Sequence, residues 1–256
     1  MIIQKKTLKN VLFLDIETVS LTKSFHELPV PLQKLWIHKS KQFLYDRSKE
    51  LTEEMAEIYY KEKAGIFAEF AKVVCISVGY LSKEKGNQTT LRIKSLFGDE
   101  SDILRSFNEI LNDHYDDLEK DYLCGHNIKE FDIPFICRRN IVNGLSLPRL
   151  LNIAGKKPWQ LQHLIDTMEL WRFGDYKNYT SLALLSGALD IPSPKDDIDG
   201  SMVGQVFWEE NDIERIVTYC EKDVLTVAQV AMKFAGQPLL KDENIEIVIE
   251  SPALAD

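Results

Sequence analysis

The amino-acid sequence predicts an α/β fold in which helices flank a mixed five-stranded sheet. Apolar runs of strand length recur along the chain, and the later ones alternate with segments whose apolar residues have helical spacing. With 256 residues, the chain is long enough for one large domain or for one domain with an insertion. Together these observations indicate a layered α/β unit.

The first three strands are expected to form an antiparallel meander. Residues 11–14 are an apolar run followed by Asp15, and residues 73–81 form a second apolar segment. Residues 89–97 alternate well enough for a third strand, joined to the second through the turn-like residues 85–87. Because the first strand is expected to end at an acidic residue, this end is predicted to be a functional edge.

The second half of the chain alternates short strands with helices. Ser101 or Asp102 is the expected N-cap of the first helix, and Pro192 is expected to stop the third. The predicted elements are a helix over 103–111, a strand over 122–125, a helix over 133–142, a strand over 163–166, and helices over 181–189 and 212–234. The complete order of strands and helices is that of a ribonuclease-H-like fold.

A polar segment, residues 24–70, separates the first two strands. It is rich in Lys and Glu at helical spacing, so it is expected to be a helical insertion packed beside the sheet. Residues 1–236 are expected to be a single domain, followed by a C-terminal tail over 237–256. Within this tail, residues 244–250 fit either an edge strand or a flexible end.

Composition places the chain among ordinary globular proteins, with 45% apolar and 28% charged residues. No apolar run approaches the ~20 residues that span a bilayer, and the N-terminal residues lack the pattern of a secretory signal. The four cysteines are far apart, which favours small core residues in a reducing compartment over disulfides or zinc. The cytoplasm is therefore the expected location, and no membrane partner is expected.

The net charge of −9 weakens a nucleic-acid-binding hypothesis without excluding it. Net charge governs long-range steering, and a local patch can oppose it. Residues 129–157 carry six basic residues against two acidic ones, and Trp159 follows them. Basic residues interleaved with an aromatic ring suit a single strand, although a solvated helix face with a charged loop explains the same pattern. The predicted strand-binding residues of this patch are Arg138, Lys156, Lys157 and Trp159.

Asp15 and Glu17 are two residues apart on the first predicted strand, so both side chains point to the same face. Two carboxylates placed in this way repel each other unless a cation lies between them. The alternative is a pair of solvated acids at an exposed strand end. Thr18 is expected only to satisfy backbone groups or to shape the turn that follows.

Two further acidic positions depend on helices. Asp132 is expected in the first turn of a helix, where an acid is also common for purely structural reasons. Tyr219 and Asp223 are four apart and therefore share one helix face, although this pairing is frequent in helices. Four carboxylates without a cysteine or histidine cluster favour hard divalent cations, Mg²⁺ or Mn²⁺, which most often serve phosphate chemistry.

As a set, residues 13–18, 125–135 and 219–223 resemble the three motifs of DnaQ-like, or DEDD, 3′→5′ exonucleases. Tyr219, in place of a histidine, is similar to the DEDDy branch, and the three segments look most like the proofreading domains of B-family DNA polymerases. Residues 193–201 and 216–230 further resemble a bacterial group of stand-alone relatives of these domains. The resemblance covers residues 10–234.

This resemblance implies two Mg²⁺ or Mn²⁺ ions that promote in-line hydrolysis of a phosphodiester. Asp15, Glu17 and Asp223 would bind the ion that activates water, with Asp15 bridging to the second ion. Asp132 would support the second ion, and Tyr219 would orient the water. The expected substrate is single-stranded DNA or a frayed 3′ end, and the expected products are nucleoside 5′-monophosphates. An exoribonuclease and a non-catalytic nucleic-acid-binding or polymerase-accessory module remain alternatives.

Residues beside the motifs have weaker predictions. Asn127 is expected either to fix the loop that carries Asp132 or to contact the substrate, and Phe131 is a candidate substrate contact. Asp166 is expected to cap the helix that follows it, more than to act as a further metal ligand. His126 is expected to be structural or a secondary contact.

Overall fold

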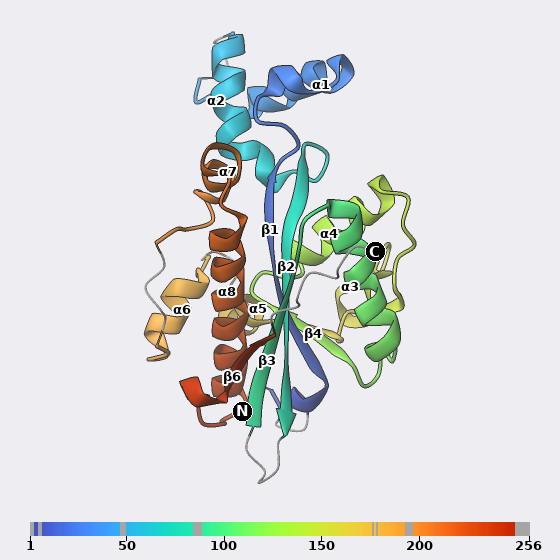
Figure 1. The fold of residues 1–256 in the computed structure, drawn as a ribbon, viewed down its shortest axis with the longest axis vertical. Coiled ribbons are helices and arrows are strands. Elements are labelled where there is room, and N and C mark those ends of the chain that lie inside the picture. Colours follow the sequence, from blue (N-terminus) through green and yellow to red (C-terminus); the bar gives the residue numbers. More distant parts are fainter. Residues whose placement is uncertain are drawn as a thin grey trace, which may run out of the picture.

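A six-stranded mixed sheet forms the centre of the protein, in the strand order β5-β4-β1-β2-β3-β6 (Figure 1). The computed structural model describes residues 3–4, 7–46, 50–83, 89–175, 177, 179–192 and 197–248. The strands are β1 (Val11–Ser20), β2 (Ala71–Lys83), β3 (Thr89–Phe97), β4 (Tyr122–Gly125), β5 (Leu164–Asp166) and β6 (Ile245–Val248). β1, β2 and β3 form the predicted antiparallel meander, and β4 and β5 extend it in parallel from β1.

β6 makes the sheet one strand wider than the predicted five. It pairs in parallel with β3, with Leu91 opposite Ile245, so the tail forms the edge strand that was one of its two expected states. A short run of weakly alternating residues cannot by itself reveal that it pairs with a strand 150 residues earlier. Residues 85–87, the expected turn between β2 and β3, lie outside the described residues.

Helices cover both faces of the sheet (Figure 1). One face packs against α8 (Ile213–Phe234), α6 (Leu182–Ala188) and α5 (Thr167–Arg172), and the other against α3 (Glu100–His114) and α4 (Asp132–Val142). Asp99 caps α3 by accepting a hydrogen bond from the backbone of Ser101, so the predicted caps were wrong by two or three residues. Although α8 has 22 residues, neither it nor any other described helix is long and apolar enough to cross a membrane.

The alternation of β1 decides which face its acids take. Leu12, Leu14 and Ile16 are buried in the core under α3 and α4, whereas Phe13 is buried in the core under α8. Because side chains alternate along a strand, the odd-numbered Asp15 and Glu17 face α8.

The predicted insertion is helical and has a small core of its own. Helices α1 (Val30–Ser40) and α2 (Glu53–Lys63) lie beyond the ends of β1 and β2 (Figure 1). The indole of Trp36 is fully buried there, donates to the carbonyl of Ala56 at 2.9 Å, and meets the Tyr60 ring edge-on at 5.2 Å. The insertion is therefore a packed unit joined to the sheet.

Two short elements before α8 were not predicted. They are α7 (Val203–Gln205) and a π-helical turn over Val206–Glu210. The turn is held by tertiary contacts: the Trp208 indole donates to Ser20 Oγ at 3.1 Å, and Lys72 Nζ lies 4.9 Å from the Trp208 ring centroid. Such turns are rare and frequent at functional sites. Short 3₁₀ turns occupy Leu8–Asn10, Phe25–Glu27, Lys41–Phe43, Ala64–Ile66, Arg149–Leu151, Pro158–Gln160 and Asp242–Asn244.

Candidate active site

The site lies where β4 stops and β1 continues. The last pair between the two strands is Phe13 with Cys124, whereas β1 runs on to Ser20. The chain turns away at Gly125, where a Cβ atom would lie 2.9 Å from Ile128, so only glycine fits this close approach. The turn opens one side of β1 beside its acids. These acids therefore lie in the middle of a ten-residue strand. The prediction that the strand ends at Asp15 was wrong.

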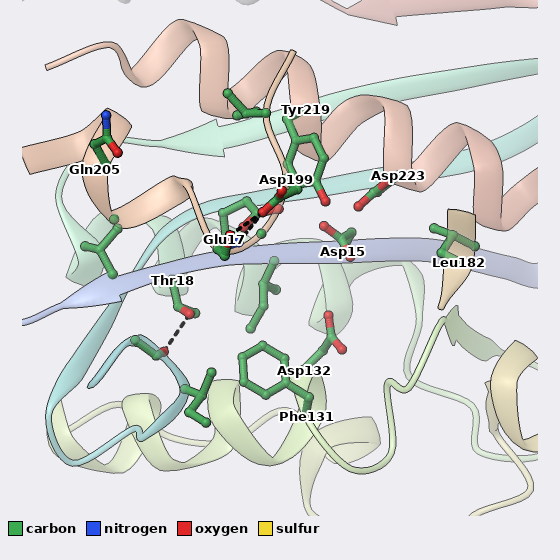
Figure 2. Close-up of a pocket in the computed structure, with 18 of the residues that line it drawn as sticks. Asp15, Glu17, Thr18, Phe131, Asp132, Leu182, Asp199, Gln205, Tyr219 and Asp223 are labelled. Carbon is green, nitrogen blue, oxygen red and sulfur yellow. Dashed lines mark hydrogen bonds between the residues drawn. The ribbon is translucent and has the colours of Figure 1, made fainter. Parts of the chain in front are cut away.

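A pocket of about 1220 Å³ fills this opening, and all five predicted catalytic residues line it. Asp15 and Glu17 come from β1, and Tyr219 and Asp223 from α8 on one side of that strand (Figure 2). Asp132, the first residue of α4, enters from the other side. The fold therefore brings together three segments that are widely separated in the sequence.

The carboxylates of the pocket disfavour one another's ionisation. Burial, followed by the charge of Asp223, raises the pKa values of Asp15 and Glu17 well above the usual range. Burial also raises the pKa of Asp132 to about 7, although backbone hydrogen bonds partly offset this shift. Within the described chain, no lysine, arginine or histidine forms an ion pair with these three acids. An acidic, oxygen-rich site of this kind fits a hard divalent cation.

Two residues of α8 contact the acids directly. The phenol of Tyr219 is hydrogen-bonded to Asp223, and burial raises its pKa far above the usual value, so the phenol stays protonated. The thiol of Cys220 donates to Asp15 Oδ2 at 3.4 Å. Cys220 also brings its sulfur within 4.8 Å of ligand atoms of Asp15 and Glu17. The thiol was expected only to fill the core, and the structure adds this contact.

Asp166 fixes the loop that leads to Asp132. Its carboxylate accepts hydrogen bonds from Met168 and Glu169 at the start of α5, which confirms the predicted cap. The same carboxylate accepts from the backbone amides of Asn127 at 3.0 Å and Lys129 at 3.1 Å. Asp166 therefore joins α5 to the turn that leads to Asp132.

Asn127 lies in the loop that precedes Asp132 and also lines the pocket, so both of its predicted roles stay open. Its backbone has a positive φ of 66° and belongs to the loop held by Asp166, while its side chain lines the pocket. The Oδ1 atom is buried and has no hydrogen-bond partner among the described residues. Phe131 also lines the pocket and packs on Phe135 with ring centroids 5.5 Å apart.

Thr18 joins the acidic strand to the insertion. A β-bulge separates Glu17 from Thr18, and bulges of this kind redirect side chains next to active sites. Thr18 Oγ1 donates to the carbonyl of Gly65 at 2.7 Å (Figure 2). The bond holds the 3₁₀ turn of the insertion at the pocket, where Ile66 is 57% exposed.

Comparison with known proteins agrees with this geometry. Residues 66–238 match a family described as a predicted 3′-5′ exonuclease related to the exonuclease domain of PolB. The chain belongs to this family. The matched residues include Asp132, Tyr219 and Asp223, whereas Asp15 and Glu17 precede them. No curated protein matched the chain.

A solved structure shows the same fold as this family member. The family B DNA polymerase from the hyperthermophilic archaeon Pyrobaculum calidifontis is 15% identical, with a TM-score of 0.50. The match covers 85% of this chain and 24% of the polymerase, so the chain spans about a quarter of that protein's length. The ribonuclease-H-like fold of a PolB-related exonuclease is thereby confirmed. The segment that resembled stand-alone relatives lies partly outside the described residues, at 193–196.

The predicted basic patch of this PolB-related chain does not reach the pocket. Arg138, Lys157 and Trp159 are exposed elsewhere, and Lys156 lines a separate small cavity. Arg139, counted in the same run, is buried and ion-paired with Glu100. The run is therefore divided in space: Lys129 and Lys156 line the small cavity, and Arg139 is buried under the sheet. Strand binding by these residues stays a prediction without support from the pocket.

Several pocket residues of this family member were not predicted. The insertion contributes Lys61 and Ile66, the segment before α8 contributes Gln205 and Trp208, and the start of α6 contributes Leu182. Tyr179 lines the same wall as Leu182. For Tyr179, the available signal was an aromatic residue just before the helix cap Ser181. This pattern is too common to single out one position.

Proposed function

We propose that the protein is a metal-dependent 3′→5′ exonuclease that releases nucleoside 5′-monophosphates from single-stranded DNA or frayed 3′ ends. The observation that carries the proposal is the convergence of four acids and Tyr219 in one pocket, with raised pKa values for Asp15, Glu17 and Asp132. Such a cluster costs stability, which makes sense when a ligand supplies the compensating positive charge. Membership in a PolB-related exonuclease family supports the reaction class.

The four acids would hold two divalent cations, Mg²⁺ or Mn²⁺. When bound, the ions would activate water and stabilise the attacking and leaving oxygens of an in-line displacement. Asp15, Glu17 and Asp223 would hold the first ion, with Asp15 shared between the two, and Asp132 would hold the second. Donation from Cys220 would keep the Asp15 carboxylate in one orientation.

Tyr219 would position the attacking water. Its phenol is protonated and lies beside Asp223, so it can hydrogen-bond a water molecule held next to that carboxylate. Asn127 would contact the strand, because the residue lines the pocket and its buried Oδ1 lacks a partner among the described residues. Phe131 would contribute an apolar surface on the same wall.

The test is digestion of a 5′-labelled oligonucleotide, offered as DNA and as RNA of one sequence, with Mg²⁺, with Mn²⁺ and with EDTA. We expect a metal-dependent ladder that shortens from the 3′ end, with DNA degraded faster. Asp15→Ala and Asp223→Ala should fold and lose this activity, and Tyr219→Phe should slow it with little change in metal affinity. Full activity in either aspartate variant would refute the assignment.

The same assay decides between the alternatives. Faster degradation of RNA would identify an exoribonuclease, since the acids do not read the 2′-hydroxyl group. Binding of either strand without shortening in any metal would identify a non-catalytic module. The cytoplasmic location stays a prediction that this assay does not address.

A further inference from the structure

Tyr179 places an exposed aromatic ring in the wall of the acidic pocket. Its side chain is 67% exposed, although the residue lines the cavity. A ring exposed at the rim of a pocket offers a flat apolar face on which a planar ligand can stack. Nothing in the chemistry assigned to the four acids uses this ring.

The backbone that presents the ring is held in place. His126 Nε2 lies 2.8 Å from the carbonyl oxygen of Thr180 and must donate to it, because a carbonyl can only accept. The other ring nitrogen, Nδ1, lies 2.9 Å from Thr167 Oγ1 at the start of α5. Ser181 then caps α6 by accepting from the amide of Leu184. Tyr179 therefore projects from a fixed point between β4, α5 and α6.

Charge separates the two ends of the pocket. Leu182 and Gln205 lie on opposite sides of the acids (Figure 2). The wall on the insertion side carries two carboxylates, Glu62 and Glu209, and two ammonium groups, Lys23 and Lys61, with Lys23 Nζ 2.7 Å from Glu209. The wall formed by the described residues 179–186 carries no charged side chain. A base that reaches this second wall therefore meets uncharged side chains beside the Tyr179 ring.

We propose that Tyr179 stacks on a base of the single strand whose 3′ end occupies the acids, and that His126 is the positioning residue for this ring. The inference rests on the proposed function and identifies the surface that selects unpaired bases. Base–aromatic stacking is sequence-tolerant and corresponds to a roughly 5- to 150-fold change in binding. Inside a duplex each base is stacked between the neighbouring pairs, so the ring reaches a base more readily when the 3′ end is unpaired.

The first test compares Tyr179→Ala with Tyr179→Phe on single-stranded oligonucleotides. Loss of the ring should raise KM about 5- to 150-fold with a smaller change in kcat, whereas phenylalanine should retain the wild-type KM. Tyr45→Ala is the matched control, since Tyr45 is fully exposed on the insertion and does not line the pocket. An unchanged KM in Tyr179→Ala would overturn the proposal.

Abasic substitutions identify the contact directly. Oligonucleotides that lack one base at successive positions from the 3′ end are compared in the wild type and in Tyr179→Ala. At the stacked position the missing base should weaken the wild type but leave Tyr179→Ala unaffected. Equal losses in both proteins at every position would overturn the stacking role. If the wild type neither binds nor shortens any strand, the proposed function itself fails, which is a different result.

A double variant tests His126. His126→Ala should raise KM for the intact strand, and adding it to Tyr179→Ala should cause little further loss. His126→Gln, which keeps a donor for the Thr180 carbonyl, should recover part of the affinity. Additive losses from the two alanine substitutions would show that His126 acts independently of the ring and would remove it from the proposal.

Discussion

Carboxylates on the two faces of the sheet fall into two groups with opposite surroundings. In the first, Glu100, at the start of α3, is largely buried and accepts hydrogen bonds from the Arg139 guanidinium, from the backbone of Val73 and from Asn143. Asp15 and Glu17, under α8, are buried beside other acids and have raised pKa values. The comparison teaches that burial of an acid does not indicate function, whereas burial without a compensating cation does.

The largest effect should come from exchanging one acid of each group for its amide. Asp15→Asn should lower exonuclease activity at least about 100-fold, because it removes a proposed metal ligand. Its free energy of unfolding without metal should stay the same or rise. Glu100→Gln should instead cost about 3–5 kcal/mol, because Arg139 is left buried without its counter-charge.

Urea unfolding and oligonucleotide digestion measure both variants. In Glu100→Gln, the fraction that remains folded should keep its activity. Similar losses of stability in the two variants would break the distinction between the groups.

The stability of the metal-free protein should fall as pH rises from about 4 to 7. The folded-state pKa of Asp132 is about 7, above the ~3.9 of an unfolded aspartate, so the folded state binds the extra proton. The stabilisation is fully present below pH ~4 and is lost as pH rises through the folded pKa. The slope amounts to about 1.4 kcal/mol per pH unit for each proton.

Thermal unfolding in EDTA over this pH interval checks the sign. Asp132→Asn should flatten the slope, and Mg²⁺ should restore stability near pH 7. A metal-free wild type that becomes more stable between pH 4 and 7 would contradict the account.

Asp166 tests whether an acid that is fully hydrogen-bonded by backbone amides also contributes to activity. Asp166→Ala removes the acceptor for four backbone amides, so we expect a loss of about 1–3 kcal/mol in stability. Activity should fall about 10- to 100-fold because the Asp132 loop loosens. Asp99→Ala, which removes the cap of α3 away from the pocket, should lose about 1 kcal/mol and keep its activity. Equal activity in the two variants would limit Asp166 to capping.

The smallest effect is expected at Cys220. Cys220→Ala removes the donor to Asp15 and should lower kcat by up to about tenfold, while Cys220→Ser should retain most of the rate. Cys137→Ala is the control, because this thiol donates to the Leu151 carbonyl outside the pocket. A Cys220→Ala variant with the wild-type kcat would show that the thiol only fills space.

Sequence reasoning succeeded where the signal is local. Tyr219 and Asp223 share a helix face because four residues make about one turn, and Asp15 and Glu17 share a strand face because side chains alternate. It failed where the partner is distant: β6 needs β3 as its neighbour, and the π-helical turn depends on contacts of Trp208 with Ser20 and Lys72 of the sheet. The basic run shows the same limit, because linear proximity did not place Arg138, Lys156, Lys157 and Trp159 in the pocket.

The sequence by itself determined the order of the elements, the residue types of the acids and the face of the strand or helix on which each lies. These features follow from the periodicity of strands and helices, which depends only on neighbouring residues. The tertiary structure decided that β4 ends beside Asp15, that α4 and α8 enter from opposite sides of β1, and that the insertion and Tyr179 wall the pocket. Those features depend on packing between distant segments, which buries the acids and brings like charges together, and both effects raise their pKa values.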